Sequence, residues 1–157
     1  MLGSAMRISE ACSLNVSSLE DMEKGFVKVL CKGGRWEKIA VAPFALEHVR
    51  HYLSLRIADS PNEPLFLSSH GRRLTREAAW KSLRKKQNAI GIKTGTHILR
   101  HSALTELDSV AGSSIASEAA IHASSGTTKR YTHRRTERVG KALRRVSYGG
   151  LFGSGGK

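Results

Sequence analysis

Residues 26–42 read Phe26-Val-Lys-Val-Leu-Cys-Lys-Gly33-Gly34-Arg-Trp-Glu-Lys-Ile-Ala-Val-Ala42, and they hold the clearest β-strand signal in the chain. Two runs rich in β-branched and aromatic residues flank two glycines, which adopt the positive φ values that tight hairpin turns need. The stretch therefore predicts an antiparallel hairpin. Lys32 stands beside the turn, where a charge is commonly just solvated; the same position would also let the hairpin carry a cation into a cleft.

The remaining patterns are helical. Apolar residues at helical spacing predict helices over residues 8–14, 43–57, 75–88, 96–107, 114–121 and 136–148. Pro43 suits a first helical turn, and Thr75 and Thr96 are favourable N-caps. The side chains expected to face inward include Leu53, Ile57, Ala79, Trp80, Val139, Leu143 and Val146.

These patterns predict an α+β fold. We expect a mostly helical domain over residues 1–148 with one small antiparallel hairpin, followed by a flexible Gly/Ser-rich tail over residues 149–157. At 157 residues the chain has the length of one domain with a substantial core. It contains no internal repeat at a solenoid period.

The charge is strongly basic and unevenly placed. The chain holds 26 Lys and Arg against 13 Asp and Glu, a net charge of +13. Residues 1–69 contain 8 basic and 8 acidic residues, so residues 70–157, with 18 basic and 5 acidic, carry the whole excess. A polyanion is the expected partner, bound mainly by the second half. There the helix over 75–88 presents a basic face that we expect to contact phosphates: Arg76, Lys81, Arg84, Lys85 and Lys86.

The sequence also indicates a compartment. No apolar run approaches the ~20 residues of a membrane span, and residues 1–7 are too short and polar for a signal peptide. Cys12 and Cys31 lie in apolar contexts without a CxxC pair, and we interpret them as buried thiols. We therefore expect a cytoplasmic, nucleoid-associated protein that does not bind membranes.

A candidate nucleophile ends the stretch His122-Ala-Ser-Ser-Gly-Thr-Thr-Lys-Arg-Tyr131. A tyrosine hydroxyl normally titrates near pH ~10, so at neutral pH it attacks a phosphate only with cations and a proton acceptor nearby. His97, Arg100 and His101 follow one another at helical spacing and share one face that could supply them. Charged side chains on one face of an otherwise buried helix cost free energy unless that face lines a binding or catalytic site.

Three other kinds of catalytic site find little support. His97 and His101 have the HxxxH spacing of a zinc helix, but Ile98 stands where a metalloprotease needs Glu. The chain has no GxxxxGK[ST] phosphate loop, and the few carboxylates of the basic half do not cluster as a two-metal nuclease requires. We therefore expect neither a metal nor another cofactor.

The order of the chemical residues resembles the catalytic half of the tyrosine recombinases, the phage integrase family. Met6-Arg-Ile-Ser-Glu10 resembles the first arginine motif, and residues 31–41 resemble the lysine hairpin. Residues 96–102 are similar to the HxLRH motif, and residues 122–133 to the closing tyrosine motif. The family's catalytic positions are filled by Arg7, Lys32, His97, Arg100, His122 and Tyr131.

The resemblance implies a reaction. Tyr131 would attack a DNA phosphodiester and form a 3′-phosphotyrosyl link, which needs neither a metal nor ATP because the bond energy is kept. Arg7, Arg100 and His122 would hold the phosphate oxygens. Lys32 would protonate the leaving 5′-oxygen, His97 would accept the tyrosine proton, and Glu10 would brace one of the cations. Lys129 and Arg130, next to the tyrosine, would add DNA contacts.

The resemblance has two departures. Ala120-Ile121 stands before His122 where the family usually has Leu-Gly, and Arg7 lies close to the first residue, whereas the family normally has further helices and a DNA-clamping domain before it. We expect an N-terminally truncated form without the clamping domain, either a fragment or the product of a shortened gene. The other hypotheses are a catalytically impaired, basic DNA-binding module and a type IB topoisomerase. The helix over 136–148 is the candidate for self-association on DNA, and it could instead fold back on its own chain.

Overall fold

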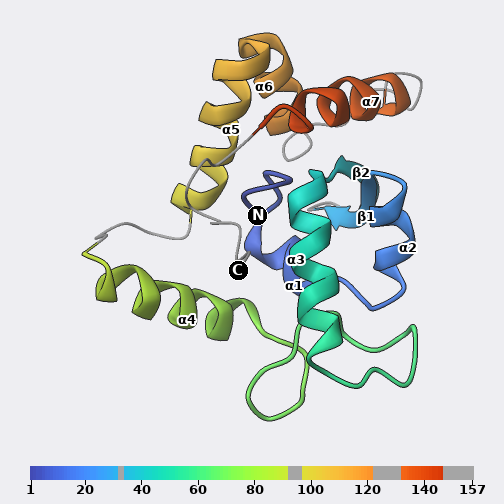
Figure 1. Ribbon diagram of the computed structural model, residues 1–157, viewed down its shortest axis with the longest axis vertical. Helices are drawn as coiled ribbons and strands as arrows, with labels where there is room; N and C mark the ends of the chain where they lie inside the picture. Colours follow the sequence, from blue (N-terminus) through green and yellow to red (C-terminus); the bar gives the residue numbers. More distant parts are fainter. Residues whose placement is uncertain (32–33, 92–96, 122–131, 147–157) are drawn as a thin grey trace, which may run out of the picture.

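The computed structural model describes residues 1–31, 34–91, 97–121 and 132–146 (Figure 1). The described elements are, in chain order, α1 (Ile8–Ser13), α2 (Ser18–Glu23), β1 (Phe26–Cys31), β2 (Arg35–Ala40), α3 (Pro43–Ser54), α4 (Arg76–Ala89), α5 (His97–Ala111), α6 (Ser113–Ile121) and α7 (Thr132–Leu143). Helices predominate and the only described sheet has two strands, so the predicted α+β class is confirmed.

The hairpin forms as the glycine-split sequence predicts. β1 and β2 pair antiparallel, from Phe26 opposite Ala40 to Cys31 opposite Arg35. Gly34 has a φ of +73°, a value that favours glycine, so the turn needs the residue that the sequence provides. Because side chains alternate across a strand, Val27 and Val29 face one side of the hairpin and Lys28 and Leu30 the other.

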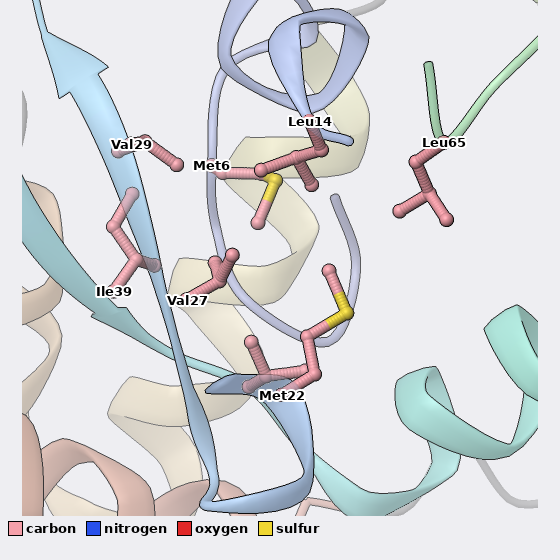
Figure 2. Packing of buried hydrophobic residues seen from close by; sticks show 8 residues of the cluster. Met6, Leu14, Met22, Val27, Val29, Ile39 and Leu65 are labelled. Atoms are coloured by element: carbon pink, nitrogen blue, oxygen red, sulfur yellow. The ribbon is translucent and has the colours of Figure 1, made fainter. Parts of the chain in front are cut away.

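One core lies against the inner face of the hairpin. Val27 and Val29 are almost fully buried, and with Ile39 they pack against Met6, Leu14, Met22, Val41 and Leu65 (Figure 2). This cluster joins the N-terminal segment, α1, α2 and the hairpin into one body. The position of the hairpin beside α1 is therefore fixed by buried apolar contact.

A second core lies behind the strand β2. Ala40 and Ala42 pack here against side chains of α5, α6 and α7 and against Val146, which follows α7; the helical side chains are Leu107, Ala119, Val139, Ala142 and Leu143. Thr136 adds a hydrogen bond from its Oγ1 to the backbone oxygen of Lys38, at 3.3 Å. In Figure 1, α5, α6 and α7 accordingly form one group above the hairpin. The helix that follows the candidate tyrosine thus packs onto the hairpin of its own chain.

The N-terminal segment fits tightly between these parts. Gly3 is buried, and its carbonyl oxygen accepts a hydrogen bond of 2.7 Å from the backbone nitrogen of Ala42. A Cβ at Gly3 would lie 2.6 Å from Cβ of Ala45 and 2.9 Å from Cζ of Phe44. Only glycine fits this crossing without displacing α3.

Several predicted details are wrong. α3 ends at Ser54, so Ile57 lies beyond it and is 85% exposed instead of facing inward. Trp80 is also exposed, because α4 packs mainly against α1 and its tryptophan ring instead stacks with the guanidinium of Arg84 at 5.2 Å. The last helix runs from Thr132 to Leu143 rather than from 136 to 148, although Val139, Leu143 and Val146 are buried as predicted.

Other predicted details are confirmed. Thr75 caps α4, since its Oγ1 accepts a hydrogen bond of 3.1 Å from the nitrogen of Ala78, and Pro43 occupies the first turn of α3. The predicted cap at Thr96 and the tail over 149–157 lie outside the described residues. Among the described residues, no helix combines the length and the apolar character that crossing a bilayer requires.

Candidate active site

Arg7 is held at the entrance of α1. The Arg7 side chain is only 34% exposed, and its Nη1 lies 3.1 Å from Oε1 of Glu10. The other carboxylate oxygen of Glu10 accepts a hydrogen bond of 2.6 Å from the backbone nitrogen of Arg7. An acid three residues into a helix often binds back to the first turn in this way, and here it also fixes a cation.

Glu10 joins Arg7 to the hairpin. It is 3% exposed, and its Oε1 also accepts a hydrogen bond of 3.8 Å from the thiol of Cys31. Cys31 is the last residue of β1 and directly precedes Lys32. The prediction that Cys31 is a buried thiol is wrong, since it is only partly buried; Cys12 is buried as expected. One carboxylate thus ties the first arginine to the strand that leads to the candidate general acid.

Arg100 reaches back to the N-terminal segment from the second turn of α5. Its guanidinium donates to the carbonyl oxygens of Ala5 and, at 3.0 Å, of Ala120 near the end of α6. Ala5 is buried with a φ of +51°, a left-handed conformation uncommon outside glycine. Arg100 therefore links the segment before Arg7 to the end of the helix that precedes His122.

Arg7 and Arg100 interact electrostatically. Burial lowers the pKa of Arg100 from its ordinary value, the positive charge of Arg7 lowers it further, and the charge of Glu10 acts in the opposite direction. Arginine nevertheless stays protonated in proteins. Arg7 Nη1 pairs with Glu10, and both terminal nitrogens of Arg100 donate to backbone carbonyl oxygens, so a phosphate bound here would use their remaining N–H groups.

Only part of the predicted catalytic set can be located. Arg100 binds the backbone two residues before Arg7, and His97 is exposed at the start of α5, one turn before Arg100 and so on the same face. Lys32, His122 and Tyr131 lie outside the described residues, as do Lys129 and Arg130. Their described neighbours are Cys31 beside Glu10, Ala120 on Arg100, and Thr132 at the start of α7.

The predicted DNA-contacting face of α4 is solvent-exposed throughout. Its basic side chains are Arg76, Lys81, Arg84, Lys85 and Lys86. The described residues contain no group of three or more His, Cys, Asp or Glu side chains that could hold a metal ion. His101 instead lies 3.2 Å from the hydroxyl of Thr105 through its Nδ1.

Two contacts at this site had no signal in the sequence. The backbone carbonyl oxygens of Ala5 and Ala120 accept hydrogen bonds from Arg100. An alanine in a sequence gives no indication that its carbonyl oxygen will bind an arginine. Cys31 resembled an ordinary core thiol until the hairpin register placed it beside Glu10. The RxxE spacing of Arg7 and Glu10 was the one local signal that could be seen in advance.

Comparison with known proteins agrees with this arrangement. The model of the phage integrase family matches residues 1–138. Tyrosine recombinase XerD of Oceanobacillus iheyensis is 37% identical over 141 residues, covering 85% of this chain and 47% of XerD. Tyrosine recombinase XerA of Pyrococcus furiosus is 32% identical over 152 residues, covering 94% of this chain and 52% of XerA. The chain spans about half the length of these curated relatives.

The fold has a match among solved structures. The crystal structure of XerA recombinase superimposes with a TM-score of 0.67, at 22% sequence identity, over 92% of this chain and 51% of that chain. This likeness concerns the fold, while the family assignment rests on the sequence match over residues 1–138. The chain belongs to the phage integrase family, the tyrosine recombinases.

Proposed function

We propose that this chain cleaves and rejoins double-stranded DNA through a covalent 3′-phosphotyrosyl intermediate on Tyr131. The observation that carries the proposal is that Arg100, from a distant part of the chain, binds the carbonyl oxygen of Ala5, two residues before Arg7, and lies close enough for the charge of Arg7 to lower its pKa. Glu10 connects that pair to the hairpin. Membership of the recombinase family supports the same reaction.

The two arginines would bind the scissile phosphate. Phosphoryl transfer spreads negative charge over the non-bridging oxygens, and donors fixed in advance can lower the barrier by several kcal/mol. A guanidinium is planar, permanently charged and able to donate two parallel hydrogen bonds to a phosphate. His122, which follows Ala120 by two residues, would contribute a further hydrogen bond.

The transfer step balances without an outside reactant. The oxygen of Tyr131 forms a bond to phosphorus as the bond to the 5′-oxygen breaks. His97 accepts the tyrosine proton and Lys32 donates a proton to the leaving oxygen, so a 5′-hydroxyl is released. The reverse attack by a 5′-hydroxyl rejoins the strand and frees Tyr131.

The basic half would hold the duplex around this centre. The exposed cations of α4, together with Lys129 and Arg130, would contact backbone phosphates and fix the position of the DNA without reading its sequence. We propose that the protein acts in the cytoplasm, on nucleoid DNA. We further propose that copies associate on DNA through the C-terminal helix, α7, whose apolar side packs on its own chain while side chains such as Arg134 and Lys141 stay exposed.

Covalent trapping on a nicked duplex tests the proposal. The chain should form an adduct that survives denaturation, and excess EDTA should leave its yield unchanged. Tyr131→Phe should abolish the adduct while DNA binding persists, and the matched variant Tyr148→Phe should retain it. An adduct in the Tyr131→Phe variant would refute the assignment, whereas binding without any adduct in the parent chain would favour the DNA-binding module.

The role of Lys32 has its own test. Lys32→Ala should cleave ordinary DNA slowly but recover on a substrate with a 5′-bridging phosphorothiolate, because a thiolate leaves without needing a proton. The variant Lys24→Ala, at a lysine that ends α2, serves as the control. Failure of the sulfur substrate to restore cleavage would remove the general-acid role from Lys32.

A further inference from the structure

A pocket of about 670 Å³ lies where the start of β1, the strand β2 and the helix α7 meet. Pockets that bind small molecules commonly have volumes of ~300–1,000 Å³. Because side chains alternate along a strand, Phe26 and Lys38, which border the pocket, lie on the face of the hairpin opposite Cys31. The thiol of Cys31 contacts Glu10, so the pocket lies on the other side of the hairpin from the candidate active site.

The walls of this pocket are held in place without a ligand. α7 and β2 share the second core, and the Oγ1 of Thr136 donates a hydrogen bond of 3.3 Å to the backbone oxygen of Lys38 (Figure 1). The turn between α2 and β1 is also fixed, because the carbonyl oxygen of Gly25 accepts a hydrogen bond of 2.9 Å from the nitrogen of Val41. A preformed pocket loses little conformational entropy when a ligand enters.

Three cations from β2, α7 and the residue after α7 border the pocket: Lys38, Lys141 and Arg144. Lys141 and Arg144 are exposed, and the Nζ of Lys38 lies 4.5 Å from the centre of the Phe26 ring. Within the part of the chain that the structure describes, no ion pair is found for any of the three. Their charges are therefore available to an anion.

Two carboxylates also border the pocket, those of Glu23 and Glu137. Glu23 is already paired with a cation, since its Oε1 lies 2.9 Å from Nη2 of Arg50. Glu137 is exposed on α7. The cations around the pocket exceed the carboxylates, so the local potential favours an anionic ligand.

The rest of the lining indicates which kind of anion fits. Phe26, Val41 and Leu46 contribute apolar surface, which a bare phosphate ion would leave uncovered and an aromatic or aliphatic group would cover. A guanidinium and two ammonium groups match the double charge and three oxygens of a phosphate ester better than a single carboxylate. A duplex instead binds cations that are spread along a surface, as they are on α4.

We propose that this pocket binds a small phosphate ester that carries an apolar group, such as a nucleoside phosphate. The site is separate from the candidate active site, and the inference goes beyond the proposed DNA strand transfer. The phosphates would lie among Lys38, Lys141 and Arg144, and the base would lie against Phe26 and Leu46. Because the pocket joins β2 to α7, a bound ligand would hold the hairpin and this helix together.

Isothermal titration calorimetry with ADP, in EDTA and without DNA, tests the proposal. One ADP should bind per chain, and adenosine, which lacks the phosphates, should bind at least about tenfold more weakly. Lys38→Gln and Arg144→Gln should each raise the Kd for ADP about tenfold, because each removes a charged hydrogen-bond donor. No binding of ADP by the parent chain would overturn the proposal.

Arg145→Gln is the matched control. It removes the same charge one residue further along, at an exposed side chain that is not among those bordering the pocket. The Kd of this variant should equal that of the parent chain. If Arg144→Gln and Arg145→Gln weaken binding equally, or if neither weakens it, ADP binds by general charge or at another place and the proposal is wrong.

Competition separates the pocket from other anion-binding surfaces. ADP titrated into the chain already saturated with nicked duplex should bind with nearly the same Kd. Displacement of ADP by the duplex would overturn the proposal and place ADP on the DNA-binding surface. A hexaglutamate peptide that binds more tightly than ADP, and that loses this binding in Arg144→Gln, would replace the phosphate ester with an acidic protein segment.

Urea unfolding gives a second measurement. A ligand that binds only the folded chain raises the unfolding midpoint once its concentration exceeds its Kd. ADP should raise the midpoint of the parent chain and of Arg145→Gln, and much less that of Arg144→Gln; equal increases in all three would contradict the proposal. None of these measurements requires strand transfer, so a chain that forms no DNA adduct but binds ADP through Arg144 would lose only the proposed function.

Discussion

Glu10 is the residue that connects the described parts of the candidate active site. It pairs with the side chain of Arg7, binds the backbone at the start of α1, and accepts a hydrogen bond from Cys31. A carboxylate only 3% exposed is costly to bury unless it is paired and hydrogen-bonded. Its loss should therefore disturb Arg7 and the end of β1 together.

The thiol of Cys31 reports on this arrangement. Burial raises the pKa of Cys31, and the negative charge of Glu10 raises it further by opposing the thiolate. Glu10→Gln removes that charge, lowers the Cys31 pKa and increases the thiolate fraction at pH ~8. Alkylation of Cys31 by iodoacetamide, followed by mass spectrometry of its peptide, should speed up by as much as about tenfold, the factor for one pKa unit.

A distant acid provides the control for that prediction. Glu47 is exposed on α3, and Glu47→Gln should leave the alkylation rate unchanged. Cys31 that reacts at the same rate or more slowly in Glu10→Gln would contradict the contact between Glu10 and the thiol.

For single residues, the sequence indicated which residues belong to the candidate site better than which atoms those residues contact. Arg7 and Arg100 were identifiable because the motifs around them are local, and the same motif contained Glu10. The contact of Glu10 with Cys31 depends on the hairpin register and on the packing of α1 against β1, which no local pattern encodes. The binding of Arg100 to the Ala5 carbonyl depends on a left-handed alanine that propensity would not anticipate.

Among the elements, the hairpin organises the fold because both its faces are used. Its inner face packs in the core around Val27 and Val29, and its outer face meets α7 at Ala40. The same hairpin leads from Cys31, beside Glu10, to Lys32. A change in packing at either core would therefore move the end of the hairpin relative to Arg7.

Two glycines test how closely elements pack. A Cβ at Gly3 would lie 2.6 Å from Cβ of Ala45, so Gly3→Ala should lower the free energy of unfolding by about 1–3 kcal/mol. At Gly140 the nearest atom, Cβ of Ala40, would be 3.8 Å away, an ordinary contact within a helix. Gly140→Ala should raise the free energy of unfolding by about 0.5–1 kcal/mol.

Urea unfolding followed by circular dichroism measures both changes. The midpoints of the two variants should move in opposite directions from that of the parent chain. A Gly3→Ala variant as stable as the parent would show that the N-terminal segment does not cross α3 as closely as described.

Periodicity predicted which elements exist but not where they end. α3 stops at Ser54 because Arg56 turns into the following loop, where its Nη1 donates to the carbonyl oxygen of Pro64 at 3.1 Å. That non-local bond ends a helical pattern that continues in sequence as far as Ile57. The exposure of Trp80 likewise follows from α4 having few neighbours besides α1, which a helical wheel cannot show.

For the whole molecule, the separation of charge predicts how DNA is bound. The excess of cations lies in the second half, and α4 presents five of them to solvent: Arg76, Lys81, Arg84, Lys85 and Lys86. Each cation that neutralises a phosphate releases counterions, so affinity should fall steeply with salt. This composition was visible in the sequence, since net charge does not depend on packing.

Fluorescence anisotropy of a labelled duplex tests this prediction. Replacing Lys85 and Lys86 with Gln should weaken binding and reduce the slope of log affinity against log salt by up to about 2, or 1 for each lost phosphate contact. Replacing Lys24 with Gln, in the electrically neutral first half, should leave the slope unchanged. Equal slopes for all three proteins would place the DNA away from α4.

The central claim is that Tyr131 attacks a phosphate held by Arg7 and Arg100. The most direct measurement is mass spectrometry of the protein–DNA adduct, trapped on a nicked duplex and digested with trypsin and nuclease. The chain has three tyrosines, and the account predicts a 3′-linked nucleotide on Tyr131 in the parent chain and its loss in Arg7→Ala and Arg100→Ala. A nucleotide on Tyr52 or Tyr148, or an unchanged yield on Tyr131 without either arginine, would contradict it.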